Sequence, residues 1–152
     1  MRECKPPAAS AIRSEDRVVF LAGSIEMGSA SNWQATLVAA LADTEVVICN
    51  PRREEWDASW RQSLDEPRFV EQVTWELDHL DRADVIAMWF DPSTKSPITL
   101  LELGLHARSG KVVVGCPAGF WRRGNLEVVC ARYSIPLVAQ WDDFVAKVRA
   151  AL

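Results

Sequence analysis

The sequence predicts an α/β protein built on a parallel sheet with helices on both faces. Segments typical of strands alternate with segments typical of helices along most of the chain. Most strand segments are continuous apolar runs, as in Val85–Phe90, which indicates strands that are buried on both faces. With 152 residues, the chain has the length of one domain with a proper hydrophobic core.

The first half of the chain contains two predicted strands and two predicted helices. Residues 17–22 form an apolar run that ends at a glycine, and residues 45–49 form another that an Asn-Pro pair stops. A helix is predicted at about 31–42, where the first serine is suited to the N-cap. A second helix is predicted at 67–83, because apolar residues recur there at intervals of three or four.

The second half continues the alternation. Strands are predicted at 84–90, 111–115 and 136–139, and helices at 97–110, 125–133 and from residue 142. Pro97 suits the first position of its helix, because its φ is fixed and no N–H is needed there. Five parallel strands in this length indicate a three-layer flavodoxin-like or Rossmann-like sheet with strand order 2-1-3-4-5. We expect residues 1–16 to form a flexible tail and residues 17–152 a single domain.

The composition argues against several classes of function. The net charge is −4 and no long basic run is present, so a nucleic acid polymer is not an expected partner. No stretch approaches the roughly 20 apolar residues of a membrane span, and no secretory signal is recognised. The four cysteines form no CxxC pair and lie far from both histidines, which argues against zinc. We expect a cytoplasmic protein that uses neither a metal nor another cofactor.

Ligands of such sheets bind at the carboxyl ends of the strands, where the strand order reverses. The two loops at that point are Gly23–Ala30 and Asp91–Pro97. The first offers a glycine and the hydroxyl of Ser24, which suit a phosphate or a sugar hydroxyl, although an ordinary strand-to-helix turn has the same composition. The charged segment 52–68 is either a lid over such a site or a surface loop with a short helix.

Glu102 is the acid that stands out near this crevice. It lies among four leucines in the helix that follows the second loop, so burial is expected. A buried carboxylate must be paired, protonated or chemically active. The alternative is a partly exposed helical glutamate beside a stripe of leucines.

Glu76 is the second candidate acid. It is flanked by Trp75 and Leu77 and could point inward, whereas the other acids of its helix are expected on a solvated face. Two carboxylates in one pocket can split their pKa values and divide the roles of acid and nucleophile. His106, four residues after Glu102, either pairs with that acid or is structural.

Seven tryptophans are many for one small domain. Those in predicted loops, including Trp56, Trp60 and Trp121, have flat surfaces that suit stacking on a nucleobase. Core packing is the competing explanation for Trp75 and Trp89.

Together these segments resemble the nucleoside 2-deoxyribosyltransferase family and its relatives that hydrolyse nucleoside 5′-monophosphates. The resemblance covers roughly residues 17–138. It rests on the order and spacing of Val18–Ile25, Glu76–Asp84, Ser96–Gly104 and Asn125. The branch often called nucleoside 2-deoxyribosyltransferase-like is the most similar one.

The resemblance implies a role for each matching residue. Glu102 would be the nucleophile that attacks the anomeric carbon, and Glu76 the acid that protonates the leaving base. Ser96 would contact the 5′ end of the sugar and Ser24 a 5′-phosphate. Asn125 would come from a neighbouring subunit, which implies a homodimer or a larger homo-oligomer. The expected substrate-binding set is Phe20, Gly23, Ser24, Ile25, Asp91, Ser96 and Asn125.

Three positions depart from the family pattern. Phe20 stands where the family often has tyrosine, which removes a hydroxyl near the nucleophile. Glu76 is one methylene longer than the family's aspartate. Glu26 replaces an arginine that assists phosphate binding, which favours an uncharged nucleoside or another N-glycoside over a nucleotide.

The sequence therefore predicts an enzyme that cleaves the N-glycosidic bond of nucleosides or deoxynucleosides. The reaction would retain configuration through a glycosyl-glutamate intermediate and pass the sugar to another base or to water. An NAD or nucleotide N-glycohydrolase is an alternative. A catalytically inactive module that binds a nucleotide-like ligand is another, and Phe20 and Glu26 favour it.

Overall fold

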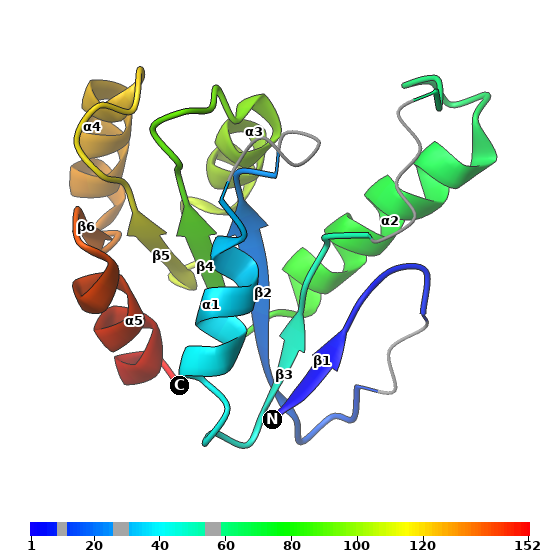
Figure 1. Cartoon of the computed structure of the whole chain (residues 1–152), viewed down its shortest axis with the longest axis horizontal. Helices are drawn as coiled ribbons and strands as arrows, with labels where there is room; N and C mark the ends of the chain where they lie inside the picture. Colours follow the sequence, from blue (N-terminus) through cyan, green and yellow to red (C-terminus); the bar gives the residue numbers. More distant parts are fainter. Residues whose placement is uncertain (9–11, 26–30, 54–58) are drawn as a thin grey trace.

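A parallel sheet lies between two layers of helices in the computed structural model (Figure 1). The structure describes residues 1–8, 12–25, 31–53 and 59–152. The strands are β1 (Arg2–Cys4), β2 (Arg17–Gly23), β3 (Val46–Cys49), β4 (Val85–Trp89), β5 (Val112–Gly115) and β6 (Leu137–Val138). The helices are α1 (Trp33–Ala40), α2 (Pro67–Arg82), α3 (Pro97–His106), α4 (Arg123–Tyr133) and α5 (Trp141–Ala150).

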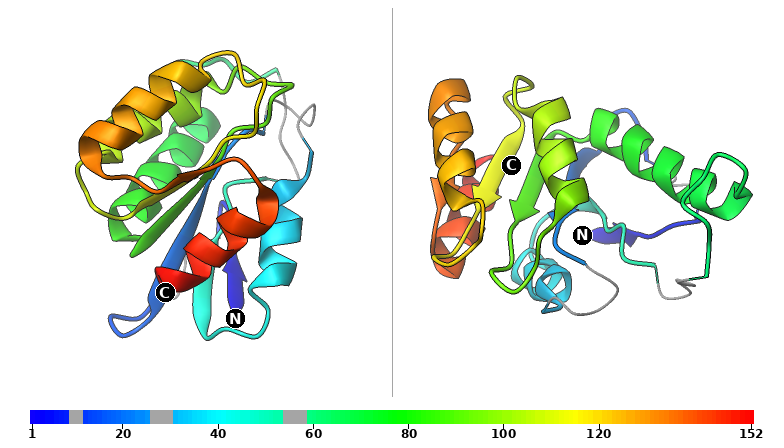
Figure 2. Two further views of the ribbon diagram at one scale, coloured as in Figure 1. Left: turned by 90° about the vertical axis from the view of Figure 1, so that its left-hand side faces the viewer. Right: turned by 90° about the horizontal axis from the view of Figure 1, so that it is seen from above.

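Neighbouring strands are all parallel, in the order β1-β3-β2-β4-β5-β6. Helices α1 and α5 cover one face of the sheet, and α2, α3 and α4 cover the other (Figure 2). The strand order reverses between β2 and β4, which pair so that Gly23 lies opposite Trp89. The carboxyl ends of these two strands therefore flank the expected ligand crevice. No helix in the described part of the chain is long and apolar enough to cross a bilayer.

The sheet has six strands, whereas the sequence predicted five. The additional strand is Arg2–Cys4, which the sequence predicted as part of a flexible tail; it pairs in parallel with Val47–Cys49 at the edge of the sheet. Because β1 is short and its first two residues are exposed and charged, it lacks the apolar run that marks the other strands. The observed order differs from the predicted 2-1-3-4-5 by this added edge strand.

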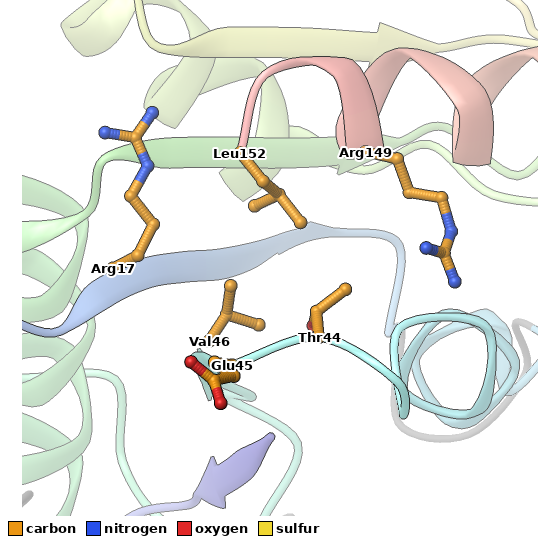
Figure 3. Close-up of a pocket in the computed structure, with 6 residues that line it drawn as sticks. All are labelled: Arg17, Thr44, Glu45, Val46, Arg149 and Leu152. Atoms are coloured by element: carbon orange, nitrogen blue, oxygen red, sulfur yellow. The ribbon is translucent and has the colours of Figure 1, made fainter.

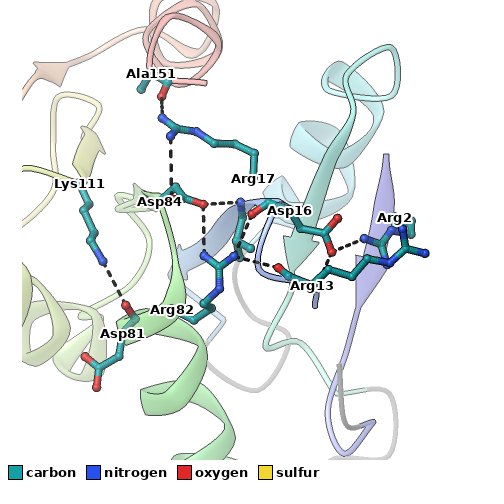
Figure 4. Close-up of polar contacts among 10 residues, drawn as sticks. Arg2, Arg13, Asp16, Arg17, Asp81, Arg82, Asp84, Lys111 and Ala151 are labelled. Carbon is teal, nitrogen blue, oxygen red and sulfur yellow. Dashed lines mark hydrogen bonds and ion pairs between the residues drawn. The ribbon is translucent and has the colours of Figure 1, made fainter. Parts of the chain in front are cut away.

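Polar contacts join distant segments at the edge of the sheet where the strands begin (Figure 4). Arg82, at the end of α2, donates hydrogen bonds to the carbonyls of Arg13 and Asp16 at 3.2 and 2.9 Å. Arg17, at the start of β2, donates to the carbonyl of Ala151 at 2.8 Å. These bonds tie the segment before β2 to α2 and the end of the chain to β2.

Asp84 holds the start of β2 beside β4, and its removal is expected to destabilise the protein. Its side chain accepts a hydrogen bond from the Val18 backbone N–H at 2.8 Å and lies 3.4 Å from Arg82. Replacing Asp84 by alanine leaves a backbone donor without its partner, which costs about 1–3 kcal/mol. Thermal unfolding is the measurement, with Asp81→Ala as the control because that side chain is exposed. Equal melting temperatures for the two variants would contradict this role of Asp84.

Candidate active site

Three side-chain hydroxyls meet between the carboxyl ends of β2 and β4. The side-chain oxygen of Ser24 lies 2.5 Å from that of Ser96 and 2.8 Å from that of Thr94. Thr94 and Ser96 are themselves 2.8 Å apart, and all three side chains are buried. The backbone N–H of Asp91 also donates to Ser24 Oγ, at 3.0 Å. The hydroxyls thus join the loop after β2 to the loop after β4.

Ser96 sets the point at which α3 leaves the sheet. Its backbone lies in the left-handed region, with φ 48° and ψ 52°, where a residue with a Cβ is strained. Pro97 follows in the first turn of α3, and the Leu100 N–H donates to the Ser96 carbonyl at 3.0 Å. The contacts with Ser24 and Thr94 hold this strained residue in place. They therefore fix the start of the helix that carries Glu102.

Asp91 links the same two loops through its carboxylate. It accepts hydrogen bonds from the Ser31 hydroxyl at 2.9 Å and from the Ser93 hydroxyl at 2.7 Å. Partial burial acts to raise the pKa of Asp91, but the hydrogen bonds from Ser93 and Ser31 outweigh it and lower the pKa. The ionised Asp91 carboxylate therefore connects the two loops that meet at the crevice through these hydrogen bonds.

Glu102 and Glu76 project from α3 and α2, which cover the same face of the sheet. Glu102 is 8% exposed, so the predicted burial is confirmed. Burial, together with the negative charge of Glu76, raises the pKa of Glu102 to about 8. Burial also raises the pKa of Glu76, and a hydrogen bond from Gln72 opposes that rise. Because the charge of Glu76 acts on Glu102, the two acids titrate as a pair.

Two buried polar residues beside these groups were not anticipated from the sequence. Gln72 donates to Glu76 Oε1 at 2.9 Å, and its spacing of four residues on one helix was the available signal. Thr94 completes the hydroxyl cluster with Ser24 and Ser96. It lies in a loop of polar residues and carries no comparable signal.

Phe20 and Gly23 are both residues of β2, and both are closely packed. Phe20 is fully buried, and its ring centroid lies 6.3 Å from that of Trp75 on α2. Gly23 ends the strand, where a Cβ would lie 2.6 Å from the Trp89 carbonyl oxygen. The backbones approach so closely that only glycine fits there.

The two remaining expected substrate-binding residues, Ile25 and Asn125, are not buried. Ile25 is half-buried directly after Ser24, and Asn125 is exposed in the first turn of α4. Glu26 lies outside the described residues.

The sequence left two interpretations of the tryptophans open, core packing and stacking on a nucleobase. Trp75 and Trp89 are buried in the two cores, which confirms core packing for both. Trp60 is buried as well, near the start of α2. Trp121 is 51% exposed and donates its ring N–H to a carbonyl of the loop after β4, so its flat surface borders that loop. Trp56 lies outside the described residues.

His106 lies at the end of α3, within the influence of charges other than Glu102. Burial lowers the pKa of His106, while Asp81 acts to raise it and Lys111 to lower it.

The surface depressions lie away from the acids. One of about 320 Å³ is at the amino edge of the sheet, and its lining residues are Arg17, Thr44, Glu45, Val46, Arg149 and Leu152 (Figure 3). Another, of about 240 Å³, lies between β1 and α1. Neither is lined by Glu102 or Glu76. Within the described residues no three His, Cys, Asp or Glu side chains are grouped to hold a metal ion.

These features define an α/β protein with paired carboxylates beside the switch point of its sheet. A family model described as "Nucleoside 2-deoxyribosyltransferase like" matches residues 16–120, which include both acids and the hydroxyl cluster. The chain belongs to this nucleoside 2-deoxyribosyltransferase-like family.

Comparison with solved structures agrees with the fold. The chain is similar to the protein titled "Crystal structure of conserved protein from Enterococcus faecalis V583", with a TM-score of 0.65 and 13% sequence identity. The match covers 90% of this chain and 99% of that one. A comparison with curated proteins found no match.

Proposed function

We propose that this protein cleaves the N-glycosidic bond of nucleosides and passes the sugar to another base or to water. The observation that carries the proposal is the pair formed by the buried Glu102 and the partly buried Glu76, in which the charge of Glu76 and burial both raise the pKa of Glu102. Retaining cleavage of a glycosidic bond needs one carboxylate as nucleophile and one carboxylic acid as proton donor. The family to which the chain belongs supports the same chemistry.

In the first step a carboxylate oxygen of Glu102 forms a bond to the anomeric carbon. The bond between that carbon and the base nitrogen breaks, and its electron pair goes to the base. The proton of the pair passes by way of Glu76 to the leaving base, which departs neutral. In the second step water or another base attacks the anomeric carbon, the ester bond to Glu102 breaks, and the proton of the attacking group returns to the pair.

We favour a nucleoside over a nucleotide as the substrate. Ser24 Oγ already accepts hydrogen bonds from the Asp91 N–H and the Thr94 hydroxyl. A 5′-phosphate would have to replace those bonds before Ser24 could hold it. Glu26 supports this preference from the sequence, because an acid in the same loop repels an anion.

Incubation with a panel of deoxynucleosides and ribonucleosides, each with a second free base, tests the proposal. Chromatography is expected to detect an exchanged nucleoside or a released base for at least one substrate. If no nucleoside loses or exchanges its base, the proposal is wrong.

The two alternative functions would give different experimental results. Release of nicotinamide from NAD, or of base from nucleotides alone, would identify an NAD or nucleotide N-glycohydrolase. Calorimetric binding of a nucleoside without turnover would identify a binding module. The full burial of Phe20, without a hydroxyl beside the acids, is the feature that favours the binding module.

We further propose that the active form is a homo-oligomer that covers the outer faces of α3 and α4. Ile98, Leu101 and Leu105 are each 59% exposed and follow one face of α3. Val128 on α4 is 70% exposed. Exposed apolar side chains along one face of a helix are typical of a surface that another protein covers. Asn125 is exposed on the same helix, less than one turn before Val128, which suits a residue that completes a neighbour's site.

Replacing Leu101 by arginine is expected to dissociate the oligomer, because it adds a charge to the middle of this surface. Sedimentation velocity is the measurement. Leu64→Arg is the matched control, since Leu64 is 90% exposed in the loop before α2 and should leave the assembly intact. A wild-type protein that sediments as a fully active monomer would contradict the oligomer.

A further inference from the structure

Gln72 is a buried glutamine on α2 that has no role in the proposed reaction. Its side chain is 2% exposed, on the inward face of α2. The amide nitrogen donates to the Pro51 carbonyl at 3.0 Å and to Glu76 Oε1 at 2.9 Å. One side chain therefore connects the loop after β3 to the second acid of the candidate site.

The orientation of this amide follows from the chemistry of its partners. The Pro51 carbonyl is an acceptor, and an ionised Glu76 is also an acceptor, so the group that faces both must be the NH₂ of Gln72. Each of its two hydrogens serves one partner. In the reversed orientation, the amide oxygen would face the Pro51 carbonyl and the Glu76 carboxylate. Neither of these acceptors has a hydrogen to donate to that oxygen.

We propose that Gln72 is a positioning residue that holds the Glu76 carboxylate in place and favours its ionised form in the free protein. The inference rests on the proposed function for its catalytic meaning, but the contact itself does not depend on turnover. A donor to a carboxylate stabilises the charged form, so when the pair holds a single proton, Gln72 directs that proton towards Glu102. Attack by Glu102 then requires that proton to move to Glu76 when the substrate binds.

Within the described residues, no charged side chain donates a hydrogen bond to Glu76. Glu102, from α3, is itself an acid, and the charge of Glu76 raises its pKa. The loop after β3 carries Arg53, whose guanidinium lies 3.3 Å from Glu71 and is therefore paired elsewhere. His79, three residues further along α2, has its ring nitrogen Nδ1 2.6 Å from the Trp75 carbonyl.

The test measures the proton affinity of Glu76 directly in the free protein. Side-chain carboxyl carbons labelled with ¹³C are titrated by NMR, and the resonances are assigned with Glu76→Gln and Glu102→Gln. In the wild type, the step at lower pH is expected on Glu76 and the step at higher pH on Glu102. In Gln72→Met, which keeps the length of the side chain but cannot donate, the Glu76 midpoint should rise by about one pH unit.

Gln34→Met is the matched control. Gln34 is also a buried glutamine, but its amide donates to the Ser24 carbonyl at 3.4 Å rather than to an acid. A general loss of packing would affect both variants, whereas only Gln72→Met should move the Glu76 midpoint. If Gln72→Met does not fold, Gln72→Glu keeps the shape and replaces the donor with an acid, and it should raise the midpoint further.

An unchanged Glu76 midpoint in a folded Gln72 variant would overturn the inference. If the protein turns over a nucleoside, the acid limb of the kcat/KM pH profile of the Gln72 variant should shift by the same amount as its Glu76 midpoint. The Gln34 variant should keep the acid limb of the wild type. A protein without turnover would contradict the proposed function only, because the NMR titration still reports on Gln72.

Discussion

Replacing Glu102 by glutamine is expected to lower the turnover of nucleosides by at least about 10³-fold while the protein stays folded. Glutamine has nearly the same shape, but its amide oxygen is too weak a nucleophile to form the glycosyl ester. Circular dichroism establishes the fold, and chromatography of released base gives the rate. Full turnover by the variant would show that Glu102 is not the nucleophile.

The same substitution is expected to stabilise the protein at pH 8 and leave its stability unchanged at pH 4. Burial and Glu76 raise the pKa of Glu102 from 4.5 to about 8. Between these values the unfolded chain is ionised and the folded protein is protonated, so the wild type loses up to about 1.4 kcal/mol of stability per pH unit as the pH rises. The glutamine variant lacks this titration. A difference in melting temperature that does not grow with pH would contradict the raised pKa.

Glu45→Gln is the matched control for both measurements. Glu45 is an exposed acid that lines the depression of about 320 Å³ at the opposite edge of the sheet. If the chemistry took place there, this variant would lose activity and the Glu102 variant would not. We expect the reverse.

Replacing Glu76 by glutamine is expected to lower turnover by about 10²–10⁴-fold, the usual range for loss of a general acid. The loss should be greatest for bases that leave poorly without a proton, because their departure depends most on protonation. The pH profile of turnover should also lose the limb that corresponds to ionisation of the proton donor. Turnover rates for a series of nucleosides with bases of graded basicity provide the measurement.

Glu71→Gln separates this role from a general effect on α2. Glu71 is exposed on the same helix and pairs with Arg53 rather than with the other acid. Its variant should keep the wild-type rate with every base. An equal loss for good and poor leaving bases in the Glu76 variant would contradict its assignment as the proton donor.

The fold was largely predictable because its central strands are marked by composition. Val85–Trp89 is a continuous apolar run, and a strand buried on both faces needs such a run. Pro97 marks the start of α3 because its fixed backbone angle suits a first turn. The edge strand Arg2–Cys4 was not predicted, because it is held by pairing with β3 rather than by an apolar pattern of its own.

The candidate site was predictable in part. The leucines around Glu102 indicated its burial, and strand order indicated which loops would meet. The sequence did not reveal that Ser24 and Ser96 bond to each other, because that contact depends on how two distant loops pack. It also did not identify Gln72: the four-residue spacing to Glu76 was a signal for a pair on one helix face, but the burial of Gln72 and its contact with the Pro51 carbonyl depend on the tertiary fold.

The anomeric configuration of the product distinguishes a covalent mechanism from direct displacement. Proton NMR of the anomeric hydrogen can follow turnover of a β-nucleoside in the presence of methanol, which traps the sugar as a methyl glycoside. A covalent ester on Glu102 requires two inversions, so the account predicts the β-methyl glycoside. Formation of the α-methyl glycoside, or no cleavage of any nucleoside, would contradict it.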